Sequence, residues 1–199
     1  MSASNLVRLG GLAAIAGGAL FVAAELLGLP TLNEETFSET VATTSYAVQQ
    51  LLFLLGVVFV LLGLVGLYVR QAEAAGALGL VGFLVAFAGT VLVAGFIWAS
   101  AFIAPALADT APHVLDGGPP PGILPSIIVF GLGWLLFGVA TLRAGVFPRA
   151  AAILLVVGAV VTVLPLPFTS LVLDVAVSWL GFALFAGRGA PAERPARVS

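Results

Sequence analysis

The chain has 199 residues, of which 61% are hydrophobic and 8% are charged, and its formal net charge is −2. A soluble domain carries about 25% charged residues, so this chain cannot cover a water-facing surface and is predicted to be an integral membrane protein. It contains no cysteine and no lysine, which excludes disulfides, iron–sulfur ligation and Schiff-base cofactors. Its one histidine, His113, cannot supply a histidine-rich metal or haem site, so no cofactor is expected.

Six apolar stretches are predicted to be membrane-spanning helices arranged as three hairpins. They cover residues 9–29, 47–69, 74–104, 122–142, 150–164 and 168–186. A span needs about 20 helical residues, so the fifth stretch is short and the third is longer than necessary. We therefore expect one all-α transmembrane domain of six helices over residues 1–187, followed by a disordered tail over residues 188–199.

The first apolar stretch admits two interpretations. Arg8, the apolar run and the small residues Val22, Ala23 and Ala24 before Glu25 fit a cleavable signal peptide. However, the run continues past Glu25 and exceeds the roughly 7–15 apolar residues that are usual in a signal peptide. The length favours a retained helix.

The predicted connections differ on the two sides of the bundle. Residues 70–73 and 143–149 are expected to be tight turns, while residues 30–45 form an acidic loop, part of which is expected to be an interfacial helix. Residues 105–121 form the second outer loop, and the GGPPPG run at 117–122 cannot be helical because proline lacks the N–H donor.

All seven arginines fall on one side of a six-span topology. They are Arg8, Arg70, Arg143, Arg149, Arg188, Arg194 and Arg197. The opposite side holds the carboxylates of Glu34, Glu35, Glu39, Asp109 and Asp116 and no arginine. Because basic residues stay on the cytoplasmic side, both termini are predicted to be cytoplasmic in a multi-pass protein of the cell membrane.

Small residues at helical spacing predict close helix–helix contacts. The stripes are Gly10, Ala14 and Gly18; Gly82, Ala86, Thr90 and Ala94; Gly56 and Gly63; and Gly131 and Gly138. General glycine richness is the alternative explanation, since the chain has 24 glycines. For the stripe that begins at Gly82 we expect a real and central interface.

Two acidic residues, Glu25 and Asp174, lie inside the apolar stretches. Ionised groups in hydrocarbon usually face the bundle interior or a hydrated cavity. Ser170, Asp174 and Ser178 share one helical face, so we expect an outward-opening polar cavity around Asp174. Thr162 and Ser100 lie at a similar predicted depth. The alternatives are that Asp174 caps or bonds its neighbours and that Glu25 extends to the surface. The surface position is favoured for Glu25 because of its shallow depth.

Trp134 and Trp179 fall near mid-span, and their indole N–H groups need acceptors. They are candidates to wall a pocket for an apolar ligand such as a lipid, isoprenoid or quinone, and ordinary packing is the alternative. The candidate ligand-binding residues are Asp174, Ser170, Ser178, Glu25, Trp134 and Trp179. Asp109, His113 and Asp116 are weak metal candidates, and a solvated loop is favoured.

Motifs of intramembrane serine and aspartyl proteases, nucleotide-binding proteins and zinc proteases are missing. The favoured function is binding or transport of an apolar or lipid-like small molecule. A non-catalytic accessory subunit that packs through its Gly/Ala faces is the alternative, and an enzyme acting on lipids is least favoured. The expected partners are the bilayer, such a molecule, and a membrane protein or second copy, with no nucleic acid.

Overall fold

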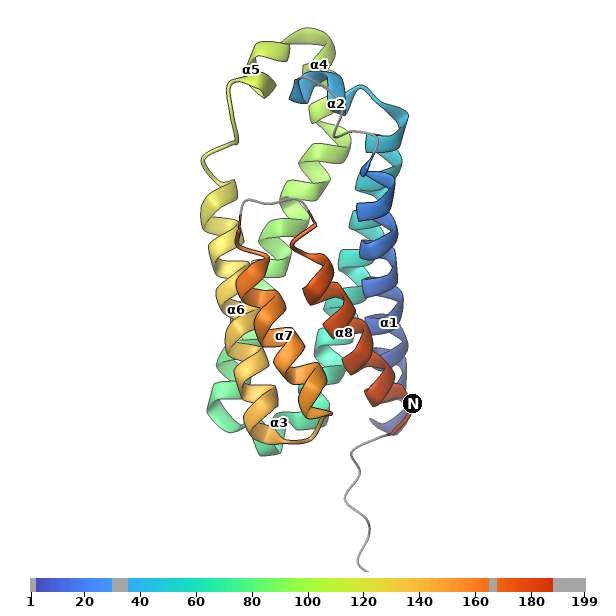
Figure 1. The fold of residues 1–199 in the computed structure, drawn as a ribbon, viewed down its shortest axis with the longest axis vertical. Helices are drawn as coiled ribbons and strands as arrows, with labels where there is room; N and C mark the ends of the chain where they lie inside the picture. Colours follow the sequence, from blue (N-terminus) through green and yellow to red (C-terminus); the bar gives the residue numbers. More distant parts are fainter. Residues whose placement is uncertain (1–2, 30–35, 165–167, 188–199) are drawn as a thin grey trace, which may run out of the picture.

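The computed structural model describes residues 3–29, 36–164 and 168–187, and every regular element in these ranges is an α-helix. The helices are α1 (Ala3–Leu27), α2 (Phe37–Val41), α3 (Thr44–Phe102), α4 (Ala104–Thr110), α5 (Pro112–Asp116), α6 (Ile123–Ala144), α7 (Arg149–Val161) and α8 (Leu171–Phe185), as drawn in Figure 1. The predicted all-α class is therefore confirmed for the described residues. Within them α1, α3 and α6 are long and apolar enough to cross a membrane.

Helix α3 is two antiparallel arms joined at Gly76. The backbone of Gly76 has φ 56° and ψ −149°, a conformation that glycine adopts without steric cost. The rings of Tyr68 and Phe83 stack with centroids 4.4 Å apart, whereas residues 15 positions apart on a straight helix lie about 22 Å apart. The first arm (residues 44–75) therefore descends and the second arm (residues 77–102) returns beside it (Figure 1).

The reversal at Gly76 corrects the turn predicted at residues 70–73. Those residues continue the first arm as helix, and Gln71 among them is only 1% exposed. The turn was predicted at the wrong place because it was inferred from polar character alone. Polar residues can stay in a helix when a neighbouring helix supplies hydrogen-bond partners. The left-handed backbone at Gly76 is what ends the arm.

The bundle packs through small residues. A Cβ added to Gly10 on α1 would lie 2.7 Å from the Cα of Gly66 on the first arm of α3. A Cβ on Gly82 of the second arm would lie 2.6 Å from the backbone nitrogen of Phe137 on α6. These approaches exclude any larger side chain. The predicted small-residue stripes are thus confirmed as helix–helix interfaces inside this chain.

Helices α7 and α8 are shorter than a membrane span. They contain 13 and 15 residues, or about 20 and 22 Å at 1.5 Å per residue, against about 30 Å of hydrocarbon. At the end of the bundle that carries α2, α4 and α5, helices α7 and α8 stop short of the ends of α1 and α6 (Figure 1). Six spanning helices are therefore not confirmed. Pro165 and Pro167 are expected to end the fifth predicted stretch, because proline lacks the N–H donor, but they lie outside the described residues.

The predicted outer loops contain three short helices. Helix α2 starts at a reciprocal cap, in which Thr36 accepts from the Glu39 N–H and Glu39 accepts from the Thr36 N–H. The prediction of residues 105–121 as a loop is wrong over α4 and α5, which each begin with a proline in the first turn, where no N–H is needed. The run at 117–122 is non-helical, as predicted.

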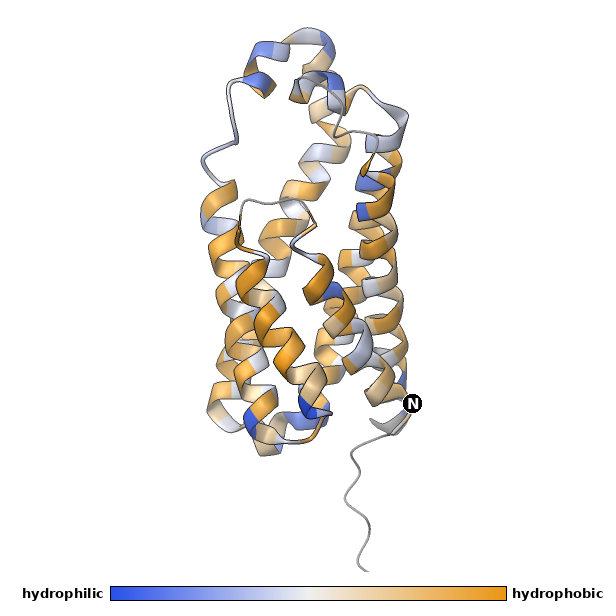
Figure 2. Ribbon diagram, in the orientation of Figure 1, coloured by the Kyte–Doolittle hydropathy of each residue, from blue (hydrophilic) through white to orange (hydrophobic). Residues whose placement is uncertain are grey.

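Apart from Glu25 on α1 and Asp174 on α8, the charged residues of the described chain lie at the two ends of the bundle, and the flanks between the ends are mainly apolar (Figure 2). Arg8, Arg70, Arg143 and Arg149 mark one end, called here the arginine end. Glu39, Asp109 and Asp116 mark the other, called the loop end. The remaining arginines, Glu34, Glu35 and the predicted disordered tail lie outside the described residues.

Candidate ligand-binding chamber

The loop half of the bundle holds a partly open cavity of about 420 Å³, called here the deep chamber. Its walls come from α1, both arms of α3, α6, the end of α7, and the beginning of α8 with the residues just before it. Because α7 and α8 stop short, only the four longer helical segments continue past them, and side chains do not fill the space between. The chamber is thus a consequence of unequal helix lengths.

The chamber wall combines aromatic rings with a few polar groups. The aromatic side chains are Phe21, Phe53, Phe96, Phe130, Trp134 and Phe168, and the polar ones are Glu25, Gln50, Thr90, Ser126, Thr162, Thr169, Ser170 and Asp174. Among these lining residues only Glu25 and Asp174 carry carboxyl groups, and none is basic. A mostly apolar cavity of this size with a few convergent polar groups is typical of a small-molecule site.

Glu25 and Asp174 are brought together by Ser170. The Ser170 hydroxyl donates a hydrogen bond of 2.5 Å to Glu25 Oε1 and also lies within hydrogen-bonding reach of the Asp174 side chain. A serine hydroxyl has only one proton to donate, so it cannot donate to both carboxyl groups at once. Asp174 is only 6% exposed, and its Oδ2 has no hydrogen-bond partner among the described residues.

A close contact between α1 and α8 positions this acid pair. A Cβ added to Gly18 would collide with Ser178 Oγ and would lie 2.6 Å from the backbone oxygen of Asp174. Glu25 is seven residues beyond Gly18 and therefore projects from the same face of α1. Ser170 precedes α8 as its N-cap, and Asp174 lies in the first turn. Helix packing at Gly18 thus aligns the start of α8 with Glu25.

Trp134 lines the chamber on the side that faces the arginine end. Its indole Nε1 donates to Thr90 Oγ1 at 3.2 Å, and the Thr90 hydroxyl donates to the Ala86 carbonyl at 2.7 Å. The predicted need for an acceptor is therefore met by Thr90. Trp134 and the neighbouring Phe137 are 1% and 0% exposed, so packed side chains separate the chamber from the arginine end.

The structure brings four of the six predicted ligand-binding residues into the chamber wall. They are Glu25, Trp134, Ser170 and Asp174. Glu25, for which a surface position was favoured, is half-buried and accepts a hydrogen bond from Ser170. Asp174 is buried in the interior, as expected.

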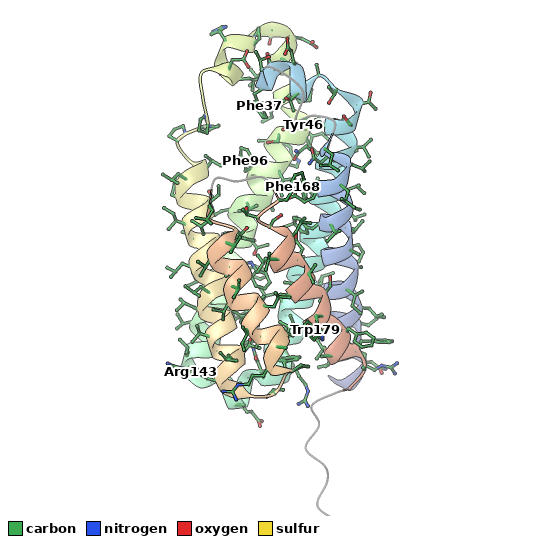
Figure 3. The ribbon with its side chains drawn as sticks, in the orientation of Figure 1. Phe37, Tyr46, Phe96, Arg143, Phe168 and Trp179 are labelled. Carbon is green, nitrogen blue, oxygen red and sulfur yellow. The ribbon has the colours of Figure 1, made fainter. Side chains whose placement is uncertain are left out.

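The other two predicted residues lie elsewhere. Ser178 is half-buried where α1 crosses α8, next to Gly18, and does not line the chamber. Trp179 is 43% exposed on the outside of α8 (Figure 3), so it does not face Trp134 across a pocket. The reason is the rotation of α8, whose buried face runs through Leu173, Ala176 and Leu180.

A second cavity of about 690 Å³, called here the outer chamber, lies at the loop end. It shares Phe96 and Ile123 with the deep chamber, so the two lie end to end. Figure 3 shows Phe96 between the labelled residues Phe37, at the loop end, and Phe168. Ser100, expected near Asp174, lines the outer chamber instead.

The loops over the outer chamber are tied by one acid. Asp116 at the end of α5 accepts hydrogen bonds from the Ser38 N–H at 2.9 Å and the Ser38 hydroxyl at 2.8 Å. Within the described residues no three His, Cys, Asp or Glu side chains gather as a metal site. The weak metal candidates Asp109, His113 and Asp116 are therefore not brought together, and Asp116 instead links α5 to α2.

Compared with known proteins, the chain matches no family model, no curated protein and no solved structure. The chemistry of the deep chamber is therefore the guide to function. Gln50, Thr90 and Phe96 line it but were not predicted as site residues. Their only sequence signal is polar or aromatic character within apolar helices.

Proposed function

We propose that the chain is a multi-pass membrane protein that binds a small, largely apolar molecule in the deep chamber. The observation that carries this proposal is the cavity of about 420 Å³ inside the bundle, with the acid pair in its otherwise mainly apolar wall. Ligand sites typically have volumes of about 300–1,000 Å³ and a few polar groups that orient the ligand. The ligand enters from the loop end through the outer chamber.

The charge asymmetry supports a topology with the arginine end in the cytoplasm and the loop end outside the cell membrane. In this topology α1, the two arms of α3 and α6 cross the bilayer, while α7 and α8 form a hairpin that enters and leaves at the arginine end. Such partial spans are tolerated where protein or a cavity surrounds the break. Both termini remain on one side, as in six full spans.

The absence of native cysteine allows a direct test of this topology. Single cysteines would replace Val114, exposed at the loop end, and Ala150, exposed at the arginine end. A membrane-impermeant maleimide added to intact cells should label Val114→Cys, and should label Ala150→Cys only after lysis. Labelling of both or neither in intact cells would contradict the proposed topology.

Binding is favoured over an accessory role because the small-residue faces are used within the chain. Ala86 is 0% exposed, and a Cβ on Gly133 of α6 would collide with the backbone of Ala86. The Gly/Ala faces of these helices are therefore already covered and cannot also dock a partner protein. Transport would require the packed layer around Trp134 to open, so binding is the function that this conformation supports.

Native mass spectrometry of gently extracted protein tests the binding proposal. We expect a bound small molecule, captured in the cell or from an added membrane lipid extract, and its loss in Val93→Trp, since Val93 lines the chamber. The control is Leu92→Trp, whose side chain is 48% exposed on the outside of the same helix. Absence of any bound molecule, or equal retention by both variants, would overturn the proposal.

A further inference from the structure

We propose that the molecule held in the deep chamber carries one positive charge, on an amine or quaternary ammonium group, between the acid pair and the aromatic wall. This inference rests on the proposed binding function and specifies its ligand class. It comes from three features of the chamber: the sign of its charge, an oxygen without a partner, and the aromatic rings that line it.

The first feature is charge. Glu25 and Asp174 are the only titratable residues that line the chamber in the described part of the chain; neither arm of α3 nor α6 contributes one. The described arginines lie toward the opposite end of the bundle (Figure 3, Arg143). A buried carboxylate is costly unless it is protonated or an opposite charge compensates it, and no described side chain supplies that charge. A cationic ligand supplies the compensation, whereas an anion would be repelled.

The second feature is Asp174 Oδ2. Asp174 lines the chamber and is only 6% exposed, yet this oxygen has no hydrogen-bond partner among the described residues. Buried polar atoms almost always have a protein or water partner, so this oxygen needs a donor that no described side chain supplies. An ammonium N–H can supply this hydrogen bond, whereas a quaternary ammonium has no N–H and interacts with the carboxylate only through its charge.

The third feature is the ring wall. Phe21 and Phe53 meet with centroids 5.3 Å apart, and Phe130 and Trp134 meet at 6.2 Å, all four lining the chamber. Aromatic faces attract organic cations and form the cages that bind quaternary ammonium groups. Ca²⁺ is usually held by several carboxylates, but this wall has only two, and no three His, Cys, Asp or Glu side chains gather anywhere in the described residues. An organic cation uses both the rings and the acids.

The test compares three probes of similar size with purified protein in detergent. They are benzyltrimethylammonium, its neutral carbon isostere neopentylbenzene, and phenylacetate, with binding followed by tryptophan fluorescence and calorimetry. We expect the cation to bind at least about tenfold more tightly than the isostere, and phenylacetate to bind most weakly. Affinity for the cation should fall as the pH falls, because protonation removes the negative charge of the acid pair.

Variants separate the acid pair from the rest of the protein. Asp174→Asn and Glu25→Gln should each lower affinity for benzyltrimethylammonium about tenfold and leave that for neopentylbenzene unchanged, which also shows that the chamber is intact. Glu39→Gln, at the exposed loop end, is the control and should change neither value.

The outcomes distinguish this inference from the proposed function. Equal binding of the cation and its isostere would overturn the inference and leave the binding proposal standing. Displacement of the cation by sodium chloride but not by choline chloride would assign the acid pair to an inorganic ion and also overturn it. If no probe binds and no bound molecule is found by mass spectrometry, the binding proposal itself fails.

Discussion

Each half of the bundle buries a small group of polar side chains, one in a packed interior and the other beside a cavity. Toward the arginine end, Gln71 Nε2 donates to Thr141 Oγ1 at 2.9 Å, and both residues are 1% exposed. In the loop half, Ser170 links Glu25 to Asp174. Each group leaves one buried oxygen without a partner among the described residues, Gln71 Oε1 and Asp174 Oδ2.

What differs is whether the residue that carries the unpartnered oxygen lines a cavity. Neither chamber includes Gln71, which lies where all six helical segments are present, whereas Asp174 lines the deep chamber. A neutral amide in a packed interior ties two helices together. A carboxyl group at a cavity can recognise a ligand. The comparison shows that α7 and α8, by ending early, divide one bundle into a packed half and an open half.

The packed half should be the more sensitive to added volume. Gly82→Leu is expected to destabilise the protein by about 3 kcal/mol, because the new side chain would meet the backbone of Phe137. The matched control is Gly95→Leu in the same arm, where an added Cβ has no atom within 4 Å, and its effect should stay below about 1 kcal/mol. Thermal unfolding in one detergent measures both, and equal losses would contradict the division into halves.

Much of this division was predictable from local pattern. The spacing of Gly10, Ala14 and Gly18 predicted a close-packed face because small residues one turn apart leave room for a neighbouring backbone. The acid inside the last apolar stretch, Asp174, predicted an interior polar site because hydrocarbon does not tolerate an exposed charge. Both arguments need only the sequence of a single helix.

Features that depend on two helices were not predictable. Glu25 and Ser170 are 145 positions apart, and their contact depends on which helix packs against Gly18. The orientation of Trp179 depends on how α8 is rotated, which its own sequence does not specify when apolar residues lie on every face. The short α7 was in part predictable, since the fifth apolar stretch was expected to be short and is followed by Pro165 and Pro167. The chamber beyond α7 and α8 was not predictable, because it also depends on how the four longer helical segments surround it.

Thr90 lies at the boundary between the halves, and its substitution is expected to destabilise the protein less than Gly82→Leu does. Thr90→Val removes the acceptor of the buried Trp134 N–H and should cost about 1–3 kcal/mol, because an unsatisfied buried donor loses its hydrogen bonds to water without replacement. Thr110→Val is the control, since the Thr110 hydroxyl makes the same kind of bond to the carbonyl four residues earlier but is exposed. A loss as large in the control would show that the helical bond, and not the indole, was the cause.

The smallest effect on stability is expected at the loop end, where the Asp116–Ser38 hydrogen bonds join α5 to α2. Asp116→Ala should change the unfolding midpoint little, because exposed polar contacts contribute about 0.5 kcal/mol or less. Amide hydrogen exchange in residues 37–41 and 112–116 should nevertheless quicken, since the link holds these short helices over the outer chamber. Asp109→Ala, at an exposed position of α4, is the control and should leave exchange in these residues unchanged.

Unaltered exchange in Asp116→Ala would mean that packing of Val41, Tyr46 and Ala104 holds the loops closed without the link. Faster exchange with unchanged global stability would show that the open half can loosen its cover while the packed half stays intact.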